Sequence, residues 1–149
     1  MRWIRGFLIT MMFVHAGATC GESCSVTATP ASFGNYDTTS PAPMDTVAEI
    51  TVSCETGIPY LIKLDPGQNA QGEFDRKLRS TAGDSTLQYN LYRDSARTEV
   101  WGDGTGNTFT RNGIGVGVPD RANVYGRIPG RQNVKADAYN DSIVITVEW

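Results

Sequence analysis

Short runs of alternating apolar and polar residues, each closed by a cluster of Gly, Pro, Asn or Asp, recur along most of this chain. In the stretch 142–149 every second residue is large and apolar: Ile143, Ile145, Val147 and Trp149. A period of two is typical of a strand that buries one face. The chain has 16 glycines and 7 prolines to divide such runs. This pattern favours an all-β sandwich or barrel.

The alternation and the turn clusters together predict the strands. We expect them at 24–29, 48–54, 60–65, 87–92, 99–101, 107–111, 123–128 and 142–149. Only 94–98 has room for a helical turn, and the polar stretch 35–45 is expected to be a long surface connection. A length of 149 residues is that of one domain with a real core.

The first 18 residues differ in character from the rest. Two arginines precede an apolar run at 6–14, and Ala-Gly-Ala at 16–18 has the form of a cleavage site. A membrane-spanning helix needs about 20 apolar residues, which is roughly twice this run. We therefore interpret 1–18 as a secretory signal peptide and 19–149 as the mature domain, with no membrane span after cleavage.

Loss of the signal peptide changes the chemistry that remains. The formal net charge falls from −3 to −5, because the two arginines leave and no acid does. An acidic surface without basic runs argues against nucleic acid as a partner. The only histidine, His15, leaves as well, which excludes Ser-His-Asp and Cys-His catalysis and imidazole-bound zinc.

The remaining acids lie mainly in turn-like stretches, where they are expected to bind their own backbone. We therefore expect no enzymatic activity and no cofactor or metal. A hydrolase that uses only two carboxylates is the one enzymatic alternative.

Three cysteines are expected in the mature chain, in an oxidising compartment. Cys24 opens the first predicted strand and Cys54 ends the second, and a bond between them would stabilise the fold by about 3–4 kcal/mol on the loop-entropy model. Spacing alone leaves Cys20–Cys54 open as an alternative.

The stretches 87–108 and 124–149 resemble the spore coat U domain, a family that includes the pilin subunits of archaic chaperone–usher pili. The resemblance spans 24–149, and Cys24 and Cys54 fall where such domains carry their disulfide. The residues that match the family motifs are Tyr89, Leu91, Tyr92, Asp94, Arg97, Trp101, Gly102, Asp103, Gly104, Tyr125, Gly126 and Arg127.

Each motif residue also has a structural interpretation, which we favour over ligand binding because no cluster of polar groups converges. Tyr89 and Leu91 share a strand face and are expected in the core. Arg97 near Asp94 has the spacing of a loop ion pair worth less than about 1 kcal/mol if exposed. Trp101 is expected to pack at a strand end before a glycine turn.

The resemblance implies an immunoglobulin-like sandwich that is incomplete, because it lacks its final strand. In such pilins a periplasmic chaperone inserts a strand beside the last strand, and a neighbouring subunit later replaces it by donor-strand complementation at an outer-membrane usher. An apolar edge without charge between Ile143 and Val147 fits this β-augmentation. The groove is then lined by Ile143, Ile145, Val147 and Trp149.

The resemblance also implies a location. The protein is expected to pass through the periplasm to the cell surface and to serve adhesion and biofilm formation as a structural subunit of a pilus. Residues 19–23 carry no alternating apolar row that could act as a donor strand. We therefore expect a minor or terminal subunit. The alternative is a secreted spore-coat or matrix protein that does not polymerise.

Overall fold

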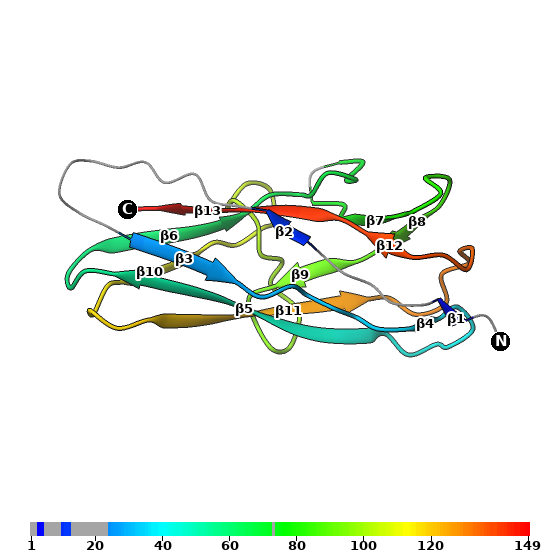
Figure 1. Ribbon diagram of the computed structural model, residues 1–149, viewed down its shortest axis with the longest axis horizontal. Coiled ribbons are helices and arrows are strands. Elements are labelled where there is room, and N and C mark those ends of the chain that lie inside the picture. Colours follow the sequence, from blue (N-terminus) through cyan, green and yellow to red (C-terminus); the bar gives the residue numbers. More distant parts are fainter. Residues whose placement is uncertain (1–2, 5–9, 13–23, 73) are drawn as a thin grey trace.

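The computed structural model describes residues 3–4, 10–12, 24–72 and 74–149. Within these residues every regular element is a β-strand, which confirms the all-β prediction (Figure 1). The strands are β1 (Trp3–Ile4), β2 (Thr10–Met12), β3 (Cys24–Ala28), β4 (Tyr36–Asp37), β5 (Met44–Cys54), β6 (Pro59–Leu64), β7 (Lys77–Ser80), β8 (Thr86–Gln88), β9 (Asn90–Tyr92), β10 (Arg111–Ile114), β11 (Asp120–Ile128), β12 (Tyr139–Asn140) and β13 (Ser142–Glu148).

The first sheet has the order β3-β5-β11-β9 and is antiparallel throughout. Its longest ladder joins β5 and β11 from Val52↔Asp120 to Met44↔Ile128. Residues 48–54 alternate buried and half-buried positions along β5, as a strand with one face in the core must. The alternation in the sequence therefore places this strand as predicted.

The second sheet has the order β10-β6-β13-β2. β13 runs antiparallel to β6 from Ile145↔Leu64 to Glu148↔Leu61. On its other side it runs parallel to β2 from Ser142↔Thr10 to Val144↔Met12. Two smaller sheets complete the fold: β12-β7-β8 at one end, and β1 paired with β4.

One apolar core lies between the first and second sheets. Figure 1 shows β6 and β13 along the upper side of the molecule and β5 and β11 along the lower side. Side chains from both sheets belong to the same cluster, including Ile50, Val124, Ile62 and Val147. Two layers that bury one face each around a shared core make a β-sandwich.

The first sheet is closed covalently by a disulfide between Cys24 on β3 and Cys54 on β5. These two residues also face each other in the strand register. The predicted pairing is thereby confirmed, and the alternative Cys20–Cys54 is not the bond formed. Cys20 lies outside the described residues, as do the rest of 19–23 and most of the predicted signal peptide.

Several predicted boundaries were wrong. The stretch 99–101 is no strand, since Val100 and Trp101 form only isolated bridges, to Tyr92 and Phe109. The strand expected at 107–111 begins only at Arg111. The stretch 35–45 is more than a surface connection, because it contains the short strand β4 and the start of β5. The possible helical turn at 94–98 does not form.

Candidate strand-docking edge

The strand β13 has two hydrogen-bonding edges. One edge pairs with β6, and the other faces away from β6. The Asp65 N–H donates to the Val144 carbonyl at 3.0 Å, and the Val144 N–H donates to the Asp65 carboxylate at 2.9 Å. Because backbone groups alternate in direction along a strand, the N–H and C=O groups of Ile143, Ile145 and Val147 point to the opposite edge. We call this edge, at Ile143, Ile145 and Val147, the β13 edge.

A parallel segment already lies on part of the β13 edge. β2 pairs with Ser142–Val144, and no strand partner from the described residues continues beside Ile145 and Val147. β2 falls inside the predicted signal peptide. In this structure β2 therefore occupies part of the edge where a supplementary strand would pair.

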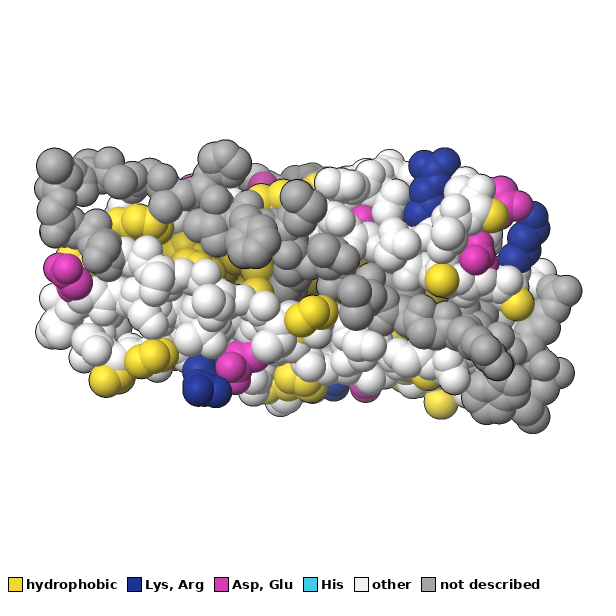
Figure 2. All heavy atoms as spheres, viewed as in Figure 1, with side chains coloured by type: hydrophobic (Ala, Val, Ile, Leu, Met, Phe, Trp, Pro, Cys, Tyr) yellow, Lys and Arg dark blue, Asp and Glu magenta, His cyan; other side chains and the backbone are white. Residues whose placement is uncertain are grey.

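The surface beside the β13 edge is apolar. Figure 2 shows apolar side chains gathered on the left half of the visible face, in the area that lies between β3 and β13 in Figure 1. β3 belongs to the first sheet and β13 to the second, so this area is the opening between the two layers. An apolar seam next to a strand edge that is only partly paired among the described residues is a template for another strand.

The four predicted groove residues divide into two kinds. Ile143, Ile145 and Val147 are almost fully buried and belong to the core, whereas Trp149 is half-buried and packs against it. Trp149 also lines a shallow depression of about 300 Å³ with Pro59, Tyr60, Leu61 and Glu148. Their role in holding a partner strand stays a prediction.

The first half of the family motif builds the interior beside β9. Tyr89 and Leu91 are in the core, as predicted. Tyr92 pairs with Tyr125 across β9 and β11 and is half-buried. Tyr89 does more than pack, because its hydroxyl donates a hydrogen bond to Asp141 at 2.7 Å.

The expected ion pair between Arg97 and Asp94 is wrong. Asp94 instead accepts hydrogen bonds from the backbone N–H groups of Thr98 and Glu99, as a turn acid does. Arg97, which has a positive φ of 57°, turns its side chain toward the first sheet. There its Nε lies 3.4 Å from Asp45 Oδ1 and donates to the Gly126 carbonyl at 3.3 Å.

The Trp-Gly-Asp-Gly motif shapes one strand end and the loop after it. Trp101 is fully buried, and its indole N–H donates to the Ile62 carbonyl at 3.2 Å. A Cβ on Gly102 would lie 2.5 Å from Thr108 Cβ, so only glycine fits this close approach. Asp103 accepts the Thr105 N–H at 2.8 Å, and Gly104 adopts a positive φ of 91°.

The Tyr-Gly-Arg element is likewise structural. A Cβ on Gly126 would lie 2.8 Å from the Phe33 ring. Arg127 makes two hydrogen bonds to Asp45, at 2.7 and 2.8 Å, in the planar fork typical of Arg and carboxylate. The Arg97 guanidinium lies 5.5 Å from the Tyr125 ring centroid. The motif thus fixes how β9, β11 and β5 pack together.

A buried polar network around Arg76 escaped the sequence prediction. The Arg76 guanidinium is fully buried and donates to the carbonyls of Asp65 and Trp101 and to the side chain of Asn90. Burial lowers the pKa of Arg76 to about 10, so it remains charged at neutral pH. Nothing in the local sequence of Arg76 marks it as buried, because its acceptors come from three separate segments.

Asp141 lies in the same region and is also buried. It accepts the backbone N–H groups of Gln68 and Asn69 and the hydroxyl of Tyr89. Burial raises the pKa of the Asp141 carboxyl and, more strongly, that of the Tyr89 hydroxyl. Among the described residues, every buried side-chain nitrogen or oxygen has a hydrogen-bond partner.

The turn acids mostly bind their own backbone, as predicted. Asp65 accepts the Gly67 N–H at 3.0 Å, and Asp103 does the same for Thr105. Three turn acids depart from this pattern. Asp84 forms an ion pair with Lys135, and Asp120 and Asp141 accept the hydroxyls of Tyr60 and Tyr89. Across the described ranges, no group of three or more His, Cys, Asp or Glu residues is placed to hold a metal ion.

A profile of the Spore Coat Protein U domain matches residues 10–146, and the chain therefore belongs to this family. Protein U of Myxococcus xanthus is 40% identical over 76 residues, which cover 50% of this chain and 40% of that protein. The chain thus spans less than half the length of this relative.

Two solved structures align with the chain over most of its length. The first is the chaperone–tip adhesion subunit pre-assembly complex CsuC–CsuE from archaic chaperone–usher Csu pili of Acinetobacter baumannii, with a TM-score of 0.59 and 20% identity over 86% of this chain and 40% of that one. The second, the E. coli Hda pilus minor tip subunit HdaB, has a TM-score of 0.43 and 17% identity over 83% of this chain and 79% of that one. The first likeness bears out the expected immunoglobulin-like β-sandwich.

No helix long and apolar enough to cross a bilayer occurs in the part of the chain that the structure describes.

Proposed function

We propose that this chain is a structural subunit of a chaperone–usher pilus at the cell surface. The observation that carries the proposal is the β13 edge, an apolar strand edge on which the structure already seats a parallel segment. Family membership and a fold like that of an archaic pilus subunit support it. The role is structural and requires no catalytic group.

The partners follow from the chemistry of such an edge. A strand added beside Ile143, Ile145 and Val147 would gain main-chain hydrogen bonds from those residues, while its alternate side chains would enter the apolar seam between β3 and β13. We propose that a periplasmic chaperone supplies this strand first. A neighbouring subunit supplies it next, at an outer-membrane usher.

The position in the pilus is a finer part of the proposal. If signal peptidase cleaves after Ala18, residues 19–23 precede β3, and their sequence Thr-Cys-Gly-Glu-Ser has no apolar alternation. A subunit with such an arm can accept a donor strand at its β13 edge but cannot provide one to a neighbour. We therefore propose that it is a minor or terminal subunit that acts in adhesion and biofilm formation. N-terminal sequencing of the exported protein tests the cleavage site, and a mature chain that keeps 10–12 would contradict it.

A second candidate function is a secreted coat or matrix protein that does not polymerise. The identity with Protein U favours it. In that case the β13 edge would be covered after export by a segment of the mature chain itself, in place of β2, which leaves with the signal peptide. The two candidates therefore differ in what lies on the β13 edge after export.

Amide hydrogen exchange on the protein purified from the periplasm distinguishes the two candidate functions. The amides of Val144, Thr146 and Glu148 face β6 and should be protected in every state. The amides of Ile145 and Val147 should be protected only when another chain covers the β13 edge, and a chaperone should co-purify. Protection of Ile145 and Val147 in a lone monomer would contradict the pilus proposal and favour the coat protein.

The substitution Ile145→Asp is a poor test of docking, because Ile145 lies in the core and a charge there would unfold the subunit. Val144→Asp is more informative. Val144 is only half-buried and its side chain faces away from the core, so the fold should survive. Chaperone capture by this variant should then match that of the wild type.

A further inference from the structure

A polar cavity lies at the end of the molecule opposite the chain's C-terminus. It has a volume of about 510 Å³ and is formed between the loop 68–71 and the hairpin of β7 and β8. The side chains that matter here are Gln68, Gln71, Arg79, Asp84 and Thr86. A volume of several hundred cubic ångströms is in the usual range for small-molecule sites.

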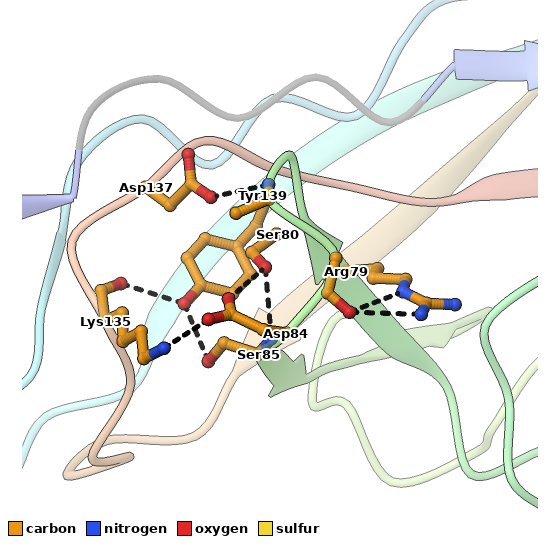
Figure 3. Close-up of polar contacts among 9 residues, drawn as sticks. Arg79, Ser80, Asp84, Ser85, Lys135, Asp137 and Tyr139 are labelled. Atoms are coloured by element: carbon orange, nitrogen blue, oxygen red, sulfur yellow. Dashed lines mark hydrogen bonds and ion pairs between the residues drawn. The ribbon is translucent and has the colours of Figure 1, made fainter.

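Arg79 is held in a fixed orientation in the wall of this cavity. Its Nε and Nη2 donate to the Gly83 carbonyl at 3.2 and 3.0 Å, as Figure 3 shows. These two bonds use one edge of the planar guanidinium. The other edge, formed by Nη1 and the second Nη2 hydrogen, is free of any hydrogen bond to the described residues, and this edge matches a carboxylate.

The hairpin tip beside Arg79 is tied to the segment 135–139. Asp84 forms an ion pair with Lys135, and the Ala82 N–H donates to Asp137 at 3.0 Å (Figure 3). The Tyr139 hydroxyl contacts the Lys135 carbonyl at 2.8 Å. These contacts fix the wall before any ligand arrives, which lowers the entropic cost of binding.

The charge of the cavity is set by Arg79. The hydrogen bond from Lys135 lowers the pKa of Asp84, so this carboxylate is ionised and its charge is balanced by Lys135. Lys77 is balanced in the same way by Asp75 at 3.2 Å. Arg79 therefore supplies a net positive charge to a polar wall.

Three further side chains in the cavity have unused hydrogen-bonding groups. Gln71 accepts a bond from Lys77 through Oε1 at 2.7 Å, which leaves its Nε2 as a donor. Among the described residues, no partner binds the side-chain amide of Gln68 or the hydroxyl of Thr86. Amides and hydroxyls around a guanidinium suit a ligand that carries both a carboxylate and several hydroxyls.

We propose that this cavity binds a uronic acid residue of an acidic polysaccharide. The free edge of Arg79 takes the carboxylate, and Gln68, Gln71 and Thr86 bind the ring hydroxyls. An acidic peptide fits less well, because the only apolar side chain in the lining is that of Ala70. No residue of the β13 edge lines this cavity, and the proposal does not depend on the proposed pilus function.

Isothermal titration of the periplasmically purified protein with a galacturonic acid hexamer, in the presence of a chelator, tests the proposal. We expect saturable binding that Arg79→Gln weakens by about tenfold or more, since the charge-assisted fork is lost. Arg79→Lys should weaken it to a similar extent, because an ammonium group lacks the fork. Thr86→Val should cause a smaller loss.

Arg121→Gln is the matched control. It removes the same charge from an exposed arginine on the first sheet and should leave binding unchanged. Equal weakening by Arg79→Gln and Arg121→Gln would overturn the proposal. So would equal binding of the methyl-esterified hexamer or of hexaglutamate, or no binding of the uronate hexamer. Chaperone capture by Arg79→Gln should stay normal, which separates this test from that of the pilus role.

Discussion

The two sheets of the sandwich differ in how completely the chain itself specifies them. In the first sheet, β5 is paired with β11 from Met44 to Val52, and β3 is attached to β5 by both a ladder and a disulfide. In the second sheet, β13 has four register pairs with β6 and three with β2, a segment inside the predicted signal peptide. The comparison shows that one layer of a sandwich can be held by long ladders and a disulfide while the other has a shorter last ladder, at the edge where we propose that a further strand binds.

Replacement of Arg76 tests whether the two sheets unfold together. Its guanidinium joins the Asp65 carbonyl, after β6 of the second sheet, to Asn90 on β9 of the first. Arg76→Ala leaves these acceptors unsatisfied and opens a cavity, so the free energy of unfolding should fall by about 3–5 kcal/mol. Urea denaturation followed by both tryptophan fluorescence and circular dichroism is the measurement.

The shape of that transition is as informative as its midpoint. We expect one cooperative transition at lower urea, and little change for the exposed control Arg121→Ala. Two separate transitions in the wild type would mean that the sheets are independent units and that Arg76 does not couple them.

Removal of the disulfide tests how far the first sheet depends on its covalent link. The bond closes a loop with a sequence separation of 30 residues. Cys54→Ala should therefore cost about 2–5 kcal/mol and lower the periplasmic yield. Equilibrium denaturation without reductant is the measurement, and Cys20→Ser should behave like the wild type. A yield from Cys20→Ser as low as that from Cys54→Ala would contradict the assigned bond.

Gly126→Ala tests the packing of the first sheet without changing its charge. The added methyl would meet the Phe33 ring and Thr46 at less than 3 Å. We expect a loss of about 1–3 kcal/mol, measured by thermal unfolding. Gly72→Ala is the control, because nothing lies within 4 Å of its Cβ and the change should stay within about 0.5 kcal/mol. Equal effects of the two substitutions would show that Gly126 is not a packing constraint.

The smallest effect is expected for the ion pair across β5 and β11. The hydrogen bond from Arg127 lowers the pKa of Asp45 below 3.8, with a further contribution from Arg97. A lowered folded-state pKa means that this contribution is present above the unfolded pKa and is lost as the pH falls through the folded one. Both partners are about one-third exposed, so Asp45→Asn should cost less than about 1 kcal/mol at neutral pH.

This pH dependence is checked by denaturing the wild type and Asp45→Asn side by side. The difference between them should shrink toward zero as the pH falls through the lowered folded-state pKa of Asp45. A difference that grows in acid would show that the carboxylate is not stabilised by Arg127.

The strands that the sequence predicts well are those whose own alternation of apolar and polar residues is enough to identify them. β5, β11 and β13 each bury one face, and alternation alone finds them. β7 escaped prediction because Lys77 and Arg79 point outward and Ser80 is buried. The burial of Ser80 depends on the Ser85 N–H, which donates to its hydroxyl.

The polar contacts were harder to predict than the strands. Arg97 and Asp94 are three residues apart, which suggested a local pair, but the positive φ of Arg97 directs its side chain to Asp45, far away in the sequence. The contacts of Arg76 were equally hard to predict, because its acceptors come together only when both sheets have formed. The disulfide was easier, since Cys24 and Cys54 mark the ends of two strands that the alternation already predicts.

The pairing of β13 with β6 also limits how early the fold can be completed. Ile145 pairs with Leu64, and β7 to β12 all lie between them in the sequence, so this contact has a large separation along the chain, which slows its formation. Until β13 has been synthesised, the apolar row of Tyr60, Ile62 and Leu64 on β6 has no neighbour on that side. A chain in that state is prone to aggregate. The second sheet therefore cannot close before the end of the chain is available, and on our proposal this interval is when a strand from a chaperone would protect the chain most.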